Sequence, residues 1–264
     1  MALFGFGKKN NDTTPVNNTP VNTGNPTLNF NKEIPNTTAG LSLQKSVLSL
    51  DKTLITLEKK SGFSFDGHRA KVAVAMDYSG SMSSLYRNGA VQAVLTRLMP
   101  LALRFDDNGE LDVWLFDNEY RRMPSMDLSN FDSYVDNEIL RNRWHMGGTN
   151  YAPVLEDMLK KYFKEDAMTA NIPTFVIFIT DGANADKTQT DRVIRESANK
   201  NIFVQFVGIG SASFPYLEKL DDLTGRVVDN TGFIKVSDMA RLSDEQLFEM
   251  LLEQYPDWLR AKPF

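Results

Sequence analysis

The sequence predicts an α/β fold with a doubly wound, mostly parallel central sheet, one antiparallel edge strand and helices on both faces. Two observations lead to this prediction. Segments 70–76, 174–180 and 202–208 are almost wholly apolar, which is typical of parallel strands that are buried on both faces. Segments with helical character alternate with them along the chain, and this alternation favours right-handed crossovers within one sheet.

The remaining elements follow from local patterns. Residues 41–60 fit both a helix and a strand, and the helix is favoured. A last helix is expected after Ser243, because serine is a good N-cap and acidic residues follow it. Segment 119–123 predicts a short antiparallel edge strand, which a tight turn at Asp117-Asn118 joins to the strand before it. Segment 255–259 is interpreted as packing back on the domain rather than as a docking tail. The other expected strands are 111–117 and 233–236, and the other expected helices are 84–104, 151–164, 186–200 and 213–222.

Composition limits the range of functions. The chain has 264 residues, a net charge of −5, no cysteine and two histidines. The negative charge argues against nucleic acid as the main partner. The lack of cysteine excludes disulfides and thiolate chemistry and is compatible with a cytoplasmic location. No apolar run is long enough to cross a membrane.

The chain is expected to have three parts. Residues 1–40 are rich in Asn, Thr and Pro and predict a disordered tail, residues 41–68 a helical extension, and residues 69–264 a single α/β domain. The start, 1–9, is apolar and then basic, the reverse of a secretory signal. Weak docking of this start on a membrane and a frayed chain end are both compatible with it, and the frayed end is favoured.

Oxygen-bearing side chains gather where two predicted strands end. Asp77, Ser79 and Ser81 follow strand 70–76 at alternate positions, so an extended chain points them the same way. Asp181 follows strand 174–180 directly. If the strand order resembles 3-2-1-4-5, these two strands are neighbours at the point where the order reverses, which is where ligands bind in such sheets.

A third segment completes the candidate site. Gly147-Gly148-Thr149 precedes a predicted helix, and the glycines would let the backbone approach a ligand closely. With the hydroxyl of Thr149, the site has two carboxylates and three hydroxyls, a donor set that suits Mg²⁺ or Mn²⁺. Two negative charges barely balance the ion, so an acidic residue of a partner protein would be attracted to its open position.

These residues carry a resemblance to a known family. Residues 69–255 resemble a von Willebrand factor A (vWA) domain, which has a Rossmann-like fold. The run from Asp77 to Ser81 matches the D-x-S-x-S motif of its metal-ion-dependent adhesion site, and Thr149 and Asp181 match the two remaining positions. The resemblance implies that Ser79, Ser81 and Thr149 bind the metal directly and that the two aspartates bind it directly or through water.

Within that family the chain looks most like the bacterial tellurium-resistance, TerF-like branch, and more distantly like copine A domains. Segments 106–109, 111–117 and 148–154 carry this impression. The branch implies a non-enzymatic, metal-dependent protein-binding module in tellurium resistance or stress response. The metal would be Mg²⁺ or Mn²⁺, and Ca²⁺ is compatible with the site.

Other interpretations of the same residues were weighed. A Mg²⁺-dependent phosphatase could use Asp77, but it needs a second acid two residues later, where this chain has Ser79. A basic patch beside Trp144 could hold nucleic acid, although solvated surface arginines are favoured. Its members would be Arg121, Arg122, Arg141 and Arg143. His145 and Trp144 could line the rim of the metal site or pack as partly buried loop residues, and the second is favoured. His68 is expected to face solvent.

Overall fold

The computed structural model describes residues 33–166 and 170–262, so most of the predicted tail lies outside the described part. The described residues form one six-stranded sheet in the order β3-β2-β1-β4-β5-β6. β3 is antiparallel to β2, and the other neighbouring pairs are parallel. The predicted fold class and the antiparallel edge strand are therefore confirmed. The strands are β1 (Lys71–Asp77), β2 (Leu111–Phe116), β3 (Tyr120–Arg122), β4 (Thr174–Thr180), β5 (Ile202–Ile209) and β6 (Thr231–Val236).

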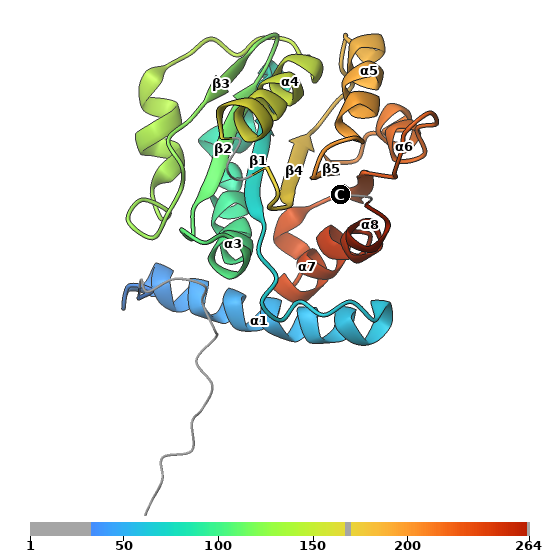
Figure 1. The fold of residues 1–264 in the computed structure, drawn as a ribbon. Helices are drawn as coiled ribbons and strands as arrows, with labels where there is room; N and C mark the ends of the chain where they lie inside the picture. The colour runs from blue at the N-terminus through green and yellow to red at the C-terminus, as the bar shows by residue number, and fades with distance from the viewer. Residues whose placement is uncertain (1–32, 167–169, 263–264) are drawn as a thin grey trace, which may run out of the picture.

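Helices cover both faces of the sheet (Figure 1). Successive residues of β1 alternate between the two apolar layers, with Val72, Val74 and Met76 in one and Ala73 and Ala75 in the other. This alternation explains why β1 is apolar at consecutive positions. The first layer includes α3 (Ala90–Phe105), α7 (Asp244–Leu252) and α8 (Tyr255–Ala261), and the second includes α4 (Ala152–Lys160), α5 (Lys187–Ser197) and α6 (Pro215–Asp221).

Two expected helices differ from the structure in their details. The predicted helix 84–104 is two helices, α2 (Ser83–Arg87) and α3, because Gly89 adopts a left-handed conformation with φ of 81° between them. The predicted helix 151–164 begins as α4 and ends in a π-helical turn, Lys161–Glu165. The sequence did not predict a further π-helical turn at Val135–Ile139.

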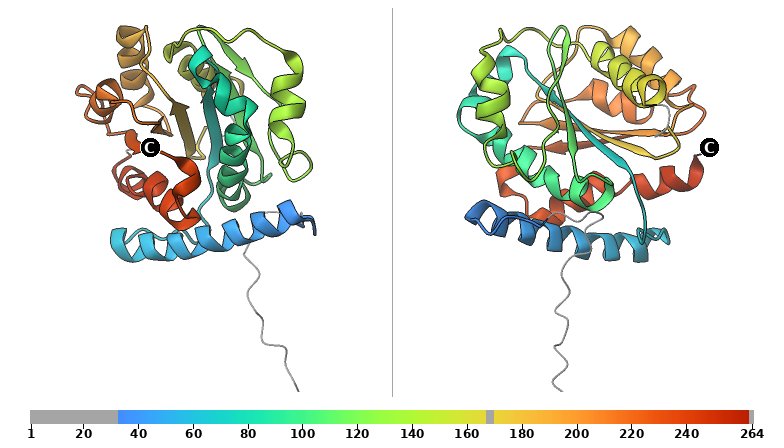
Figure 2. Two further views of the ribbon diagram at one scale, coloured as in Figure 1. Left: turned by 180° about the vertical axis from the view of Figure 1, so that it is seen from behind. Right: turned by 60° about the vertical axis from the view of Figure 1, so that its left-hand side comes forward.

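The ambiguous segment 41–60 is a helix, as favoured, and belongs to α1 (Thr38–Ser61). It begins before the expected boundary at residue 41, because the side chain of Thr37 accepts a hydrogen bond from the amide of Gly40 and caps it. α1 packs on α3 and α7 across the end of the domain where β1 begins (Figures 1 and 2). Its buried apolar side chains are Leu43, Val47, Leu50, Leu54 and Leu57.

One sequence expectation is wrong at this end of the molecule. His68 does not face solvent but packs edge-on against the rings of Phe63, Phe65, Phe105 and Tyr255. Burial lowers its pKa to about 4, and the charges of Lys262 and Arg104 add to this effect. The contact of His68 with Tyr255 could not be predicted from the local sequence, because Tyr255 lies near the other end of the chain.

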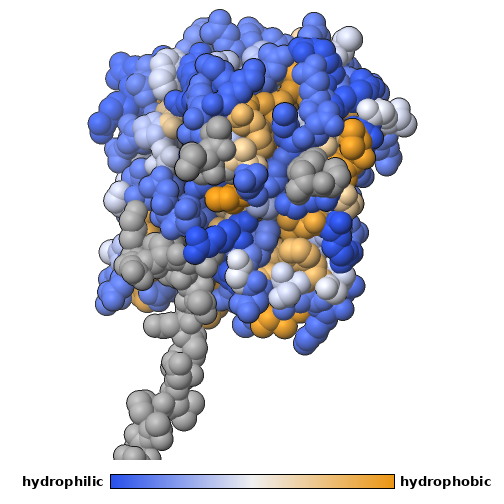
Figure 3. Space-filling model, in the orientation of Figure 1, coloured by the Kyte–Doolittle hydropathy of each residue, from blue (hydrophilic) through white to orange (hydrophobic). Residues whose placement is uncertain are grey.

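The C-terminal segment behaves as expected. Tyr255 and Trp258 are buried, and Tyr255 packs on Phe175 and Phe203, so segment 255–259 is part of the core. On the face of Figure 1 the surface is mostly hydrophilic, with apolar residues visible between hydrophilic ones (Figure 3). In the described part of the chain, no helix is both long and apolar enough to cross a membrane.

Candidate metal centre

β1 and β4 are adjacent, so Asp77 and Asp181 leave the same edge of the sheet. Asp77 is fully buried. Its Oδ1 accepts a hydrogen bond of 2.8 Å from the amide of Ser79, and its Oδ2 accepts one of 2.7 Å from the hydroxyl of Thr180. Burial raises the pKa of Asp77 to about 6; the hydrogen bonds from Ser79 and Thr180 oppose this shift, and the charge of Asp181 adds to it.

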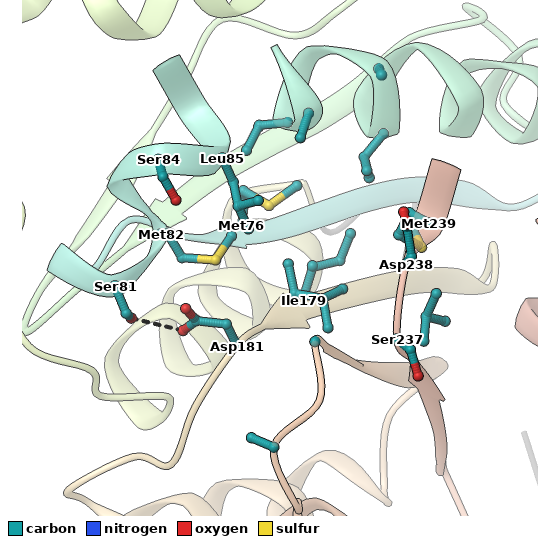
Figure 4. A pocket seen from close by; sticks show the side chains of 18 of the residues that line it. Met76, Ser81, Met82, Ser84, Leu85, Ile179, Asp181, Ser237, Asp238 and Met239 are labelled. Carbon is teal, nitrogen blue, oxygen red and sulfur yellow. Dashed lines mark hydrogen bonds between the residues drawn. The ribbon is translucent and has the colours of Figure 1, made fainter. Parts of the chain in front are cut away.

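The two serines connect Asp77 to Asp181. After Ser79 the chain turns into a short 3₁₀ helix, Gly80–Met82, which brings the hydroxyls of Ser79 and Ser81 to 3.1 Å. The hydroxyl of Ser81 donates to Oδ1 of Asp181 at 2.9 Å (Figure 4). Four of the five predicted residues therefore form one hydrogen-bonded chain at the point where the strand order reverses.

Thr149 approaches this chain from a third loop. The amide of Gly80 donates to the carbonyl of Gly147 at 3.1 Å, and the amide of Ala185 donates to the carbonyl of Thr149 at 3.0 Å. The loop 147–149 is thus tied to the segments that follow both β1 and β4. Within the described residues, the hydroxyl of Thr149 forms no hydrogen bond to the other four, so it stays available for another partner.

The paired glycines serve a purpose that the sequence did not reveal. The expectation that they let the backbone approach a ligand stays a prediction. In the structure, a Cβ atom on Gly148 would lie 2.6 Å from Oδ1 of Asn118, and one on Gly147 would lie 3.3 Å from Cβ of Asp117. The glycines therefore let loop 147–149 pack against the turn after β2.

No cation balances the two aspartates from within the described residues: no lysine, arginine or histidine forms an ion pair with Asp77 or Asp181 there. Asp157 is a contrast, because it is equally buried and pairs with Arg122 at 2.6 Å. Buried carboxylates are normally paired or bound to metal. Within the described residues this pair has no cation and is joined by the hydroxyls of Ser79 and Ser81, an arrangement that fits a divalent ion with oxygen ligands.

Sequence reasoning missed the residues that hold the site in place. Thr180 orients Asp77, and its hydroxyl in turn accepts from that of Tyr151 at 3.2 Å. The hydroxyl of Tyr86 donates to the carbonyl of Asp77 at 2.9 Å. Asp186 accepts hydrogen bonds from the first amides of α4 and so fixes the helix that follows Thr149. The sequence contained an indication only for Thr180, a polar residue that follows five consecutive apolar residues at the end of a strand.

A cavity of about 560 Å³ opens directly beside the centre. Ser81 and Asp181 line one end of it, and apolar side chains line its middle (Figure 4). It lies between the ends of four strands and the first turns of α3. The sequence could not predict it, because its walls come from segments far apart in the chain. Its apolar walls include Met76, Met82, Leu85, Val91, Val94, Ile179, Ile209, Val236 and Met239.

The other candidate sites have structural roles. Trp144 is partly buried, as favoured, and packs on the ring of Tyr78 and under the guanidinium of Arg121. Arg122 is held by Asp157 and Glu165, so this part of the proposed basic patch is not free for nucleic acid. Residues 33–166 and 170–262 contain no group of three or more His, Asp or Glu side chains placed to hold a metal ion. The centre at Asp77 is not such a group because it contains only two carboxylates, and its other candidate ligands are hydroxyls.

Comparison with known proteins agrees with this fold. A Bacillus subtilis protein, the uncharacterized protein YcbR, is 42% identical over 224 residues, which cover 84% of this chain and 87% of YcbR. Copine-C of Dictyostelium discoideum is 24% identical over 69% of this chain and 38% of its own length.

Among solved structures, the chain is similar in fold to proximal thread matrix protein 1 from the mussel byssus, with a TM-score of 0.53 and 16% identity. The match covers 72% of this chain and 48% of that one. It is also similar to a von Willebrand factor type A protein from Catenulispora acidiphila, with a TM-score of 0.52 and 18% identity, over 70% of this chain and 42% of that one. This chain thus covers less than half of either solved structure. The model of the vWA domain found at the C terminus of TerF matches residues 69–263. The chain therefore belongs to the TerF-like family of von Willebrand factor A domains.

Proposed function

We propose that the protein binds one divalent cation at Asp77, Ser79, Ser81, Thr149 and Asp181 and uses it to capture a partner protein. The observation that carries this proposal is the pair of carboxylates, joined by two serine hydroxyls, that no cation of the described residues balances. The metal is Mg²⁺ or Mn²⁺, and Ca²⁺ is compatible with the same oxygen ligands.

The charge of the site supports partner capture. Two carboxylates balance a divalent ion, and the three hydroxyls add no charge. Mg²⁺ prefers six oxygen ligands and keeps waters in the positions that the protein leaves open. An acidic side chain of a partner protein would replace such a water and add a charge-assisted bond to the ion.

The neighbouring cavity indicates which side chains the partner protein presents to the site. Because Ser81 and Asp181 lie on its wall, a carboxylate bound to the ion would stand at its mouth. The apolar walls would then bury a large apolar side chain next to the acidic residue. Three methionines among the lining residues allow the walls to adapt to different shapes. We therefore expect the partner to present an acidic residue beside an apolar one.

We propose that the protein is not an enzyme. A phosphatase that uses Asp77 would need a proton donor two residues later. Ser79 stands there, and its hydroxyl is hydrogen-bonded to that of Ser81. A role in tellurium resistance or a related stress response, in the cytoplasm, is consistent with the TerF-like family.

Titration calorimetry with Mn²⁺ and Mg²⁺ tests the metal centre. Wild type should bind one ion, and Asp181→Asn should weaken binding at least about 100-fold, because a direct or water-mediated ligand of the ion loses its charge. Asp106→Asn is the matched control, since Asp106 is also a buried carboxylate but lies beside the start of β1, where it pairs with Lys71. Equal binding by wild type and Asp181→Asn would contradict the site assignment.

A second measurement tests capture. Peptides that carry Asp beside Phe should bind wild type only with metal present, and peptides with Asn in place of Asp should not bind. Mg²⁺-dependent hydrolysis of a generic phosphate ester, lost in Asp77→Asn, would instead establish the phosphatase.

A further inference from the structure

The outer face of α1 carries an exposed apolar stripe at the end of the molecule opposite the metal centre. Five large apolar side chains stand out as exposed in the described part of the chain, and three of them belong to α1. These are Leu41, Leu48 and Ile55, which are 48%, 41% and 52% exposed. Their spacing of seven residues is close to two helical turns, so they lie on one side of the helix.

Lysines alternate with these apolar residues. Lys45, Lys52 and Lys59 each follow one of them by four residues, and all three lysines are exposed. At the helical rotation per residue, the six side chains fall within an arc of about 80°. None of the three lysines forms an ion pair within residues 33–166 and 170–262. We call these six residues the α1 stripe.

Acidic groups lie beside the stripe, on the side that faces α7. There Glu245 accepts a hydrogen bond from Ser49, which lowers the pKa of Glu245. The charge of Lys52 adds to this effect. Glu249 pairs with Lys60. Both acids are thus held on the flank of α1, and the stripe itself combines apolar and positive side chains.

The placement of α1 lets a flat surface reach the whole stripe. In all three views α1 is the outermost described element at its end of the domain (Figures 1 and 2). Leu41 and Ile55 are 14 residues apart on one helix, which corresponds to about 21 Å. A plane that touches this helix would leave the carboxyl ends of the strands, and with them the metal centre, facing away.

A second copy of the chain fits this face poorly. Two α1 stripes packed together would bring lysines against lysines. A coiled coil also needs a second apolar position in each heptad, and here these positions are Gln44, Asp51 and Glu58. Charge complementarity instead favours an anionic partner with an apolar interior.

We propose that the α1 stripe docks the protein on an anionic lipid surface, with the metal centre exposed to solution. Leucine and isoleucine side chains would enter the boundary between headgroups and acyl chains, while lysines pair with anionic headgroups. The segment from Met1 to Lys9 has the same chemistry, with Leu3, Phe4 and Phe6 followed by two lysines.

Co-sedimentation of the full chain with vesicles tests the proposal. Phosphatidylcholine vesicles are compared with vesicles that contain about one-third phosphatidylglycerol, at low and high salt. Wild type should bind the anionic vesicles at least about tenfold more strongly, and high salt should weaken binding. Two triple variants should each bind the anionic vesicles about tenfold or more weakly than wild type. They are Leu41→Ser/Leu48→Ser/Ile55→Ser and Lys45→Gln/Lys52→Gln/Lys59→Gln.

Two controls keep the result specific. Val227→Ser removes an exposed apolar side chain outside α1 and should bind like wild type. Thermal unfolding should show that all variants remain folded, because the changed side chains are exposed. Failure of wild type to bind anionic vesicles overturns the proposal, as does full binding by both triple variants. Loss of binding in Phe4→Ser/Phe6→Ser alone would assign docking to the N-terminal segment instead.

Discussion

At the end of the domain where β1 begins, α1 buries five apolar side chains against α3 and α7, and two cations at the base of the sheet and on α3 are paired with aspartates. Arg97 bonds to Asp244 at 2.8 Å, and Lys71 bonds to Asp107 at 2.7 Å. At the carboxyl ends of the strands, two aspartates meet without a cation from the described residues, and a cavity stands open beside them. The buried side of α1 is stabilised by contacts within the domain, whereas the charge of the two aspartates is left unbalanced by such contacts.

This contrast has a physical basis. Apolar burial and paired charges lower the free energy of the folded chain without outside help. A buried carboxylate without a cation raises it, and such residues persist mainly where a ligand supplies the missing charge. The following predictions test the contrast, from the largest expected effect to the smallest.

The largest change in the free energy of unfolding should come from a substitution on the buried side of α1. Leu50→Ala removes a fully buried side chain from its contact with the core and should lower the free energy of unfolding by about 3–4 kcal/mol. Urea denaturation measures this change. Leu48→Ala, two residues away and 41% exposed, should change it by less than about 0.5 kcal/mol. Similar losses in the two variants would show that α1 does not pack as described.

The next effect depends on pH. His68 has a pKa of about 4 in the folded chain, against an ordinary value of 6.5, so the unfolded chain binds its proton first as pH falls. Its contribution to stability is present above pH 6.5 and should be lost towards pH 4, by about 3 kcal/mol. Unfolding by urea between pH 7 and pH 4 measures the slope. His68→Phe should flatten it, and an unchanged slope in that variant would contradict the assignment.

A smaller effect of opposite sign is expected at the metal centre. Asp77→Asn removes a buried charge that has no cation and keeps the size of the side chain. In the presence of a chelator it should raise the free energy of unfolding by about 1 kcal/mol while abolishing metal binding. Asp157→Asn is the control, because it breaks a buried pair with Arg122 and should lower stability by about 2 kcal/mol. If both variants had a lower free energy of unfolding than wild type, the charges of Asp77 and Asp157 would both stabilise the fold, which would contradict the predicted contrast.

The smallest effect on stability is expected at the cavity. Ala93 lines it from an exposed position on α3, so Ala93→Phe should change the free energy of unfolding by less than about 0.5 kcal/mol. The new ring would occupy the cavity and weaken binding of an Asp-Phe peptide, while calorimetry should show unchanged metal binding. Ala93→Ser is the matched control. Equal peptide binding by Ala93→Phe and Ala93→Ser would show that the cavity takes no part in binding the peptide.

Much of the fold was predictable because the information is local. Apolar runs define β1, β4 and β5 since both faces of these strands are covered. Four of the five candidate ligands meet because strand order places the ends of β1 and β4 side by side, and the motif around Asp77 already indicates that geometry. Ser243 begins α7 with a capping box, another feature set by neighbours in the chain.

What the sequence left open depends on contacts between distant segments. The environment of His68 depends on Tyr255, the support of Asp77 on Thr180, and the fit of Gly148 on Asn118. The sequence by itself determined the strands and indicated the candidate metal ligands, because side-chain chemistry and periodicity are local properties. Only the tertiary structure decided that no cation of the described residues balances the aspartates, that a cavity lies beside them, and that α1 packs across the opposite end. These are properties of packing, in which each residue's environment is set by partners far away in the chain.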